Sequence, residues 1–167
     1  MKLYSAKELR FTGLYKWWAK KSEVEEILEK LSSTLTFSEI KPYIEHEKVD
    51  DKDYYCIYVG IANPKPVLAR VVAQHIYGSG KSTLRKTLTS LLGTKKAVDD
   101  FIDKLFVGFE KSTLGKGELK KYEAKQINSQ AHILNLDENS YESITDKDVR
   151  DKLLQLSEQL SKLRSKL

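Results

Sequence analysis

The sequence predicts an α/β fold in which a small, mostly antiparallel sheet of three strands is flanked by helices. Short segments rich in aromatic and β-branched residues predict the strands, at residues 11–18, 54–61 and 105–111. Segments with apolar residues three and four positions apart predict the helices. The longest of these patterns covers residues 146–167 and predicts a long C-terminal helix.

Length and composition are typical of one soluble domain. The chain has 167 residues, of which 40% are hydrophobic and 32% are charged. Its one cysteine, Cys56, excludes an intrachain disulfide and a Cys-rich zinc site, and fits a reducing compartment. No secretory signal is visible, nor any apolar run near the ~18 residues of a membrane helix. We therefore expect a cytoplasmic protein.

Positive charge is concentrated in the middle of the chain. Residues 51–135 hold fourteen basic and eight acidic side chains, whereas the net charge of the whole chain is +5. A basic surface attracts polyanions and supplies contacts to phosphate. Many Lys-rich proteins bind no nucleic acid, so charge alone does not decide the partner.

Side-chain alternation in the first predicted strand places Tyr15 and Trp17 on one face and Lys16 on the other. Capping-box patterns predict that one helix begins at Ser22 and that Thr145 caps the C-terminal helix. After the second strand, one helix is expected from Val67, and another from near Ser82 to a stop at Gly93. The remaining predicted elements are helices at 97–104 and 118–130 and an extended piece at 133–136.

Four weak motifs occur in a defined order. Gly13-Leu14-Tyr15 lies in the first predicted strand and Tyr58-Val59-Gly60 lies in the second. Arg70 follows about ten residues later, and Glu123 and Asn135 complete the series. Together with the segments STLRKTLTSLLG and LNLDEN, this set resembles the GIY-YIG nuclease family and a subset of it.

The resemblance implies a Mg²⁺- or Mn²⁺-dependent endonuclease acting on DNA, with RNA still open as substrate. Glu123 would hold the metal, and Arg70 would grip the scissile phosphate with its planar fork of donors. Tyr15 would take a proton from water, Tyr58 would hydrogen-bond nearby, and Asn135 would order the site. Since a tyrosine with a pKa of about 10 is a poor base, positive charge from Mg²⁺ or Arg70 would have to lower the pKa of Tyr15.

His75 is a further catalytic candidate whose position does not quite fit. The family often has His or Tyr four residues after the Arg, where this chain has Gln74. His75 is one residue later, so on an ideal α-helix its side chain is rotated by about 100° from the family position. Either the helix is irregular or His75 does not occupy the family position.

Ile61 is a second departure, because several family members have Lys directly after the second motif. Lys65 or Lys81 could substitute for it. The predicted nucleic-acid-binding residues are Lys65, Lys81, Arg85 and Lys86.

Two other functions stay open. A non-catalytic DNA-binding or interaction module on the same fold would share the basic central region. Alternatively, residues 80–83 (GKST) look like the end of a phosphate-binding loop, with residues 67–76 as its preceding strand, which would indicate a nucleotide hydrolase. The first glycine of that loop would have to stand at His75.

Residues 1–140 are expected to form the nuclease domain, with 20–50 as a helical insertion between the two tyrosine strands. Residues 141–167 form the C-terminal helix. This helix either packs on its own domain or pairs with a second copy in a homodimer. Its heptad-like seam consists of Val149, Leu153, Leu156, Leu160, Leu163 and Leu167.

Overall fold

A four-stranded antiparallel sheet with the order β2-β3-β1-β4 forms the centre of the molecule. The structure is a computed structural model that describes residues 9–31, 34–76, 78, 82–136 and 139–167. The strands are β1 (Gly13–Ala19), β2 (His46–Val49), β3 (Lys52–Ala62) and β4 (Phe106–Lys111).

Strand β2 corrects the prediction of a three-stranded sheet and of a purely helical segment at 20–50. It has only four residues, HEKV, of which the first three are exposed, and it lies at the edge of the sheet. Such a strand shows no apolar alternation, so the sequence pattern did not reveal it. Asp50 and Asp51 join β2 to β3 with φ angles of 49° and 60°, as a two-residue hairpin loop requires.

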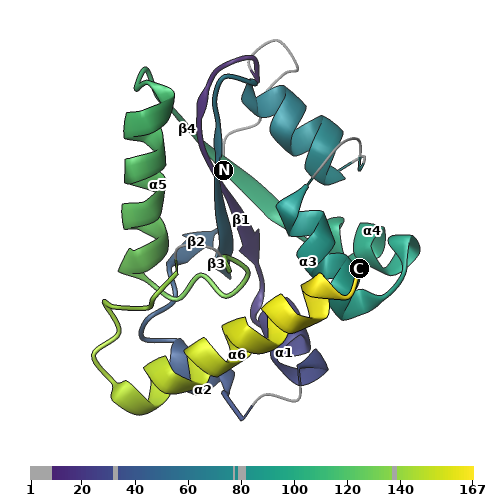
Figure 1. Cartoon of the computed structure of the whole chain (residues 1–167), viewed down its shortest axis with the longest axis vertical. Coiled ribbons are helices and arrows are strands. Elements are labelled where there is room, and N and C mark those ends of the chain that lie inside the picture. The colour runs from purple at the N-terminus through teal and green to yellow at the C-terminus, as the bar shows by residue number, and fades with distance from the viewer. Residues whose placement is uncertain (1–8, 32–33, 77, 79–81, 137–138) are drawn as a thin grey trace.

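Helices cover both sides of the sheet. Figure 1 shows α5 on one side, the π-helix η1 with α3 and α4 on the other, and α6 across one end. No helix in the described part of the chain is both long and apolar enough to cross a membrane. The helices are α1 (Lys21–Lys30), α2 (Phe37–Ile40), η1 (Leu68–Ile76), α3 (Thr83–Leu92), α4 (Lys95–Ile102), α5 (Lys116–Ser129) and α6 (Lys147–Ser165).

A β-bulge in β3 places two consecutive side chains on one face. Along β1, Trp17 pairs with Tyr58, but the next residue, Trp18, pairs with Cys56. Ile57 is therefore the extra residue, and both Ile57 and Tyr58 belong to the larger core. Bulges re-aim side chains and are common near active sites. This one turns Tyr58 to the same face as Tyr15.

Two helices begin at other residues than the capping patterns predicted. For α1, the Glu23 carboxylate accepts a hydrogen bond from the Lys20 backbone N–H at 2.9 Å, so the helix starts before Ser22. For α6, the cap is Asp146 rather than Thr145, and its side chain accepts a first-turn N–H at 3.2 Å. In both helices an acidic side chain satisfies a backbone N–H at the N-terminus.

The leucine seam of α6 packs against the chain's own core, which is one of the two alternatives left by the sequence. Helices α1, α2 and α3 contribute apolar side chains to the same core. Leu163 is partly buried and Leu167 is 66% exposed at the end of the seam. A homodimer through α6 stays an untested prediction. The buried seam residues are Val149, Leu153, Leu156 and Leu160.

Candidate active site

One cavity of about 320 Å³ collects all the residues predicted to be catalytic. They come from β1, β3, η1, α5 and the segment after α5, so the fold brings together positions that lie far apart in the sequence. A larger cavity of about 710 Å³ contains none of the predicted site residues in its lining. The predicted residues that line the smaller cavity are Tyr15, Tyr58, Arg70, His75, Glu123 and Asn135.

The π-helix resolves the spacing of His75. Helix η1 is wound with i→i+5 hydrogen bonds, so residues five apart lie one turn from each other. Arg70 and His75 have this separation, and both line the cavity. The irregular helix was one of the two alternatives, and it places His75 in the site despite its extra residue. π-Helical segments are rare in proteins, and many of those that are found lie at functional sites.

A buried hydrogen-bonded chain runs from Tyr15 through His75 to Ser82. The Tyr15 hydroxyl is 2.7 Å from His75 Nε2, and His75 Nδ1 is 2.6 Å from Ser82 Oγ. Burial, with smaller contributions from Arg70 and Arg85, lowers the pKa of His75 from 6.5 to about 4. His75 is therefore neutral near pH 7, with one ring nitrogen as donor and the other as acceptor.

In the protein alone, the pKa of Tyr15 is raised, and the charge of Arg70 is not sufficient to lower it. Burial raises the pKa well above its usual value, and the neighbouring Tyr58 and Glu123 add to the increase. Arg70 acts in the opposite direction but does not offset burial. Without a ligand in the cavity, Tyr15 holds its proton and is not a free phenolate base.

Arg70 is held from one side only. Its Nη1 donates to Gln74 Oε1 at 3.0 Å, which gives a structural role to the residue that replaces the family's His or Tyr. The Nε–H of Arg70 is buried and has no hydrogen-bond partner among the described residues. A buried donor of this kind is costly unless a ligand satisfies it. The Nε edge of the guanidinium is thus suited to an anionic oxygen.

Asn135 fixes the backbone of β3 beside the cavity. Its Oδ1 accepts from the Val59 N–H and its Nδ2 donates to the Val59 carbonyl, both at 2.8 Å. The Leu134 N–H also donates to the Ile57 carbonyl. Since β2 pairs only with residues 52–55 of β3, the segment around Asn135 bonds to the part of the same β3 edge that β2 does not reach. Residues 133 and 134 lie in a turn closed by a hydrogen bond from the Asn135 N–H to the His132 carbonyl, and no extended piece forms at 133–136. Asn135 therefore holds the backbone of β3, and its role in ordering an active site stays a prediction.

Comparison with family models decides the identity of this arrangement. Residues 13–159 match the model of the GIY-YIG catalytic domain. The chain belongs to the GIY-YIG family. Membership supports a nuclease function in general terms. Neither the comparison with curated proteins nor the comparison with solved structures gave a match.

The donor set of this GIY-YIG site suits a hard divalent cation. Glu123 lies on α5 and brings a half-buried carboxylate to the cavity. The amide of Asn135 is committed to Val59, so it does not serve as a second ligand. Mg²⁺ binds to proteins through one or two carboxylates and completes its shell with water and substrate phosphate. A single Glu123 in an open, polar cavity fits that chemistry.

The predicted nucleic-acid-binding residues that the structure describes lie in different surroundings. Lys65 is exposed in the turn after β3, and Lys81 lies outside the described residues. Lys86 lines a neighbouring hollow of about 390 Å³. Arg85 instead binds inside the protein: its guanidinium donates to the carbonyls of His75 and Ile76 at 3.0 and 3.1 Å and to Asp99 at 2.6 Å. These bonds give Arg85 a structural role at the end of η1, and a phosphate contact would have to compete with them.

Sequence reasoning missed two polar residues that line the cavity, Lys120 and Thr83. Lys120 stands three residues before Glu123 on α5, a spacing that puts both side chains on the same helix face. That spacing was the available signal. Thr83 lines both the cavity and the hollow that contains Lys86, so the two depressions adjoin.

The alternative of a phosphate-binding loop predicted a β-strand at residues 67–76, and this prediction is wrong. Residues 68–76 form the π-helix, whereas such a loop follows a β-strand. Ser82 caps α3 by accepting the Arg85 backbone N–H at 3.1 Å, and Gly93 ends α3 as predicted. Ser82 and Thr83, the described part of the GKST segment, are thus the cap and first residue of a helix in a GIY-YIG fold.

Proposed function

We propose that this chain is a divalent-metal-dependent endonuclease that hydrolyses phosphodiester bonds in DNA. The observation that carries the proposal is the convergence of two phenols, a guanidinium, an imidazole and a carboxylate around one cavity. Phosphodiester hydrolysis needs such a set: donors to neutralise the phosphate, a path for the proton of water, and a ligand for a metal ion.

Arg70 is proposed to bind the scissile phosphate. Gln74 holds Nη1, and the Nε edge of the fork is left to donate to phosphate oxygens. Lys120 adds a second positive charge at the cavity. Because both groups are fixed on helices, they act on the phosphate with little reorganisation.

Tyr15 and His75 are proposed to move the proton of the attacking water together. Since the raised pKa of Tyr15 disfavours a stable phenolate, Tyr15 accepts a proton from water as it passes its own proton to His75 Nε2. In this tautomer His75 Nδ1–H donates to Ser82 Oγ, which holds the imidazole in place. The charge of Arg70 is one of the causes that lower the pKa of His75. A phosphate bound to Arg70 offsets this charge, so His75 accepts the proton more readily.

Glu123 is proposed to hold Mg²⁺ or Mn²⁺. When bound, the ion stabilises negative charge on the phosphate and on the leaving oxygen. Asn135 acts indirectly, by fixing the backbone of β3 next to Tyr58.

A plasmid cleavage assay tests the proposal. The parent protein with Mg²⁺ should convert supercoiled plasmid to nicked or linear forms, and EDTA should prevent it. Glu123→Ala and Arg70→Ala should each lower the rate by about 100-fold or more, as loss of one donor to a developing charge does in other enzymes. Glu118→Ala, an exposed residue of the same α5 helix, is the matched control and should cleave like the parent.

Equal cleavage by the parent and by both site variants would show that the activity comes from another site or a contaminant. Duplex, branched and single-stranded DNA and an RNA duplex, offered in parallel, would identify the substrate class. Faster cleavage of RNA than of every DNA substrate would contradict the DNA assignment while keeping the nuclease.

The second candidate function is a DNA-binding module without activity. It is favoured by Ile61, an apolar residue in the cavity lining where several family members have Lys. It predicts that the parent binds DNA without cleaving it in either Mg²⁺ or Mn²⁺, and that binding survives Glu123→Ala. The nuclease reading predicts cleavage by the parent that Glu123→Ala removes.

A further inference from the structure

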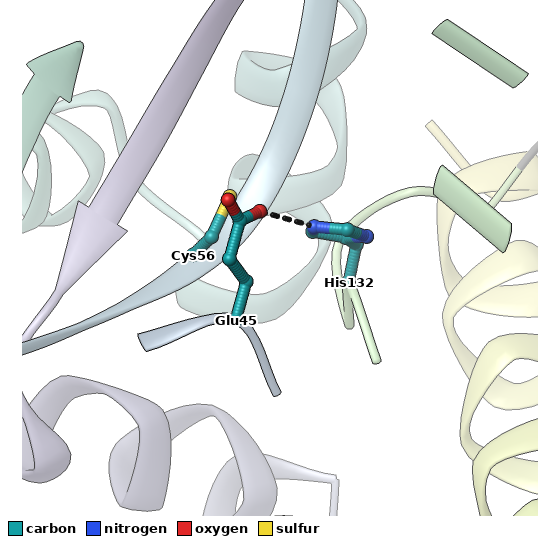
Figure 2. Close-up of side chains that lie close together, drawn as sticks. All are labelled: Glu45, Cys56 and His132. Carbon is teal, nitrogen blue, oxygen red and sulfur yellow. Dashed lines mark hydrogen bonds and ion pairs between the residues drawn. The ribbon is translucent and has the colours of Figure 1, made fainter. Parts of the chain in front are cut away.

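Three potential metal ligands of different types converge beside β2, away from the cavity that contains Glu123. Glu45 precedes β2, Cys56 lies on β3 and His132 follows α5. One ligand atom from each lies within 4.8 Å of the others. Figure 2 shows the Cys56 sulfur beside the Glu45 carboxylate, toward which the His132 ring is turned. Cys56 and His132 are both fully buried.

The imidazole of His132 is oriented as a metal-binding histidine usually is. Its Nδ1 lies 3.1 Å from the Ile127 carbonyl, which requires an N–H on Nδ1. Its Nε2 faces Glu45 Oε2 at 3.2 Å in a hydrogen bond, and a bound cation would take the place of the proton between these two atoms. Histidine ligands typically donate their second ring N–H to a carbonyl or carboxylate in this way.

The separation of the Glu45 oxygen and the His132 nitrogen suits a small tetrahedral ion, and the Cys56 sulfur lies within 4.8 Å of both. With zinc bonds of about 2.0–2.1 Å to oxygen and nitrogen, tetrahedral geometry places these two atoms about 3.3 Å apart. The Glu45–His132 distance of 3.2 Å is close to this value. Lys16 Nζ donates to Glu45 Oε1 at 2.6 Å, so Oε2, the partner of His132, is the carboxylate oxygen that would bind the cation.

We propose that Glu45, Cys56 and His132 form a second metal site that binds a zinc-class divalent cation, with water as the fourth ligand. Thiolate, imidazole and carboxylate are the ligand types of zinc, whereas Mg²⁺ takes oxygen ligands. On binding, the Cys56 thiol releases its proton to solvent and its sulfur bonds to the ion. This site is independent of the nuclease proposal.

The ion would join three segments that support the nuclease site. The Ala131 N–H already donates to the Tyr43 carbonyl and the Cys56 N–H to the Glu45 carbonyl, so these segments lie side by side. His132 is bonded to Ile127, one helical turn after Glu123 on α5. A cation here fixes the C-terminal end of α5 to the sheet and raises thermal stability by mass action.

Cobalt titration tests the site without any variant. Cys56 is the sole cysteine of the chain, so a sulfur-to-cobalt charge-transfer band can arise only from Cys56. The reduced parent protein, freed of metal, should develop this band with one Co²⁺ per chain, and Zn²⁺ should abolish the band and raise Tm. If cobalt in large excess gives no such band, the proposal is wrong.

Two variants then identify the other ligands. His132→Gln and Glu45→Gln should weaken Co²⁺ binding at least about 100-fold, because even the partners of ligands contribute about 10–100-fold. Glu47→Gln, an exposed neighbour on β2, is the control and should bind like the parent. Circular dichroism verifies that each variant is folded. A folded His132→Gln protein with the parent's affinity would overturn the ligand assignment.

Discussion

The phenol ring of Tyr15 lies directly over Gly60, its partner on β3. A β-carbon at position 60 would be 2.4 Å from the hydroxyl oxygen of Tyr15. Non-bonded carbon and oxygen atoms do not approach so closely. The glycine of the second motif therefore leaves the space that the tyrosine of the first motif occupies. The two motifs are thus one structural unit, in which Gly60 allows Tyr15 to reach His75.

Gly60→Ala should therefore inactivate the site by displacing Tyr15. The added methyl would push the phenol away from His75 and cost about 1–3 kcal/mol of stability, as overpacking does in other cores. Because a misplacement of about 1 Å can cost about 100-fold in rate, cleavage should fall by at least that factor. Urea unfolding and the plasmid assay measure the two effects. Gly117→Ala, with no heavy atom within 4 Å of the added carbon, should leave activity unchanged. Parent-like cleavage by Gly60→Ala would show that the Tyr15 position is not critical.

His75 should make stability depend on pH. Its pKa is about 4 in the folded protein and near 6.5 in the unfolded chain, because burial disfavours the charged ring. Above pH 6.5 the ring is neutral in both states, and its contribution does not change. Between pH 6.5 and 4 only the unfolded state binds the proton, so the folded state is progressively destabilised.

The loss of unfolding free energy from about pH 7.5 to about pH 5 should be about 2 kcal/mol larger in the parent than in His75→Gln. Urea denaturation at both pH values measures it, and the variant removes the contribution of the carboxylates common to both proteins. The same pH dependence in both proteins would rule out a buried neutral His75.

Local patterns predicted much of this fold, and they failed where tertiary contacts decide. Alternation in β1 was sufficient to place Tyr15 on the face of the sheet that carries the larger core. It could not reveal β2, because this edge strand is polar and shows no apolar alternation, although it pairs with β3 through a two-residue loop. The spacing of Arg70 and His75 was read on an α-helix, and only the π-helix brings both to the cavity. Arg85 looked like a surface cation because nothing local shows its bond to Asp99.

Asn135→Ala should destabilise the protein through the backbone of β3. The substitution leaves the N–H and carbonyl of buried Val59 without their side-chain partners. An unsatisfied buried polar group costs about 1–3 kcal/mol, so the loss should be about 2 kcal/mol or more. Urea unfolding measures the loss, and hydrogen exchange should show faster exchange of the Val59 amide. Asn63→Ala is a suitable control, since the Asn63 amide makes only a 3.3 Å bond at an exposed turn. Unchanged exchange at Val59 would mean that Asn135 does not hold this strand.

Adjacent leucines on α6 test whether the seam serves the core or a dimer. Leu153 is fully buried in the larger core, whereas its neighbour Leu154 is 41% exposed. Leu153→Ala should lower the free energy of unfolding by about 2–5 kcal/mol, because it removes buried methyl groups and leaves a cavity. Leu154→Ala should change it by less than about 0.5 kcal/mol. Urea unfolding at two protein concentrations separates the alternatives, since a dimer would unfold at higher urea when more concentrated. Concentration-dependent unfolding of the parent that Leu154→Ala abolishes would establish the homodimer after all.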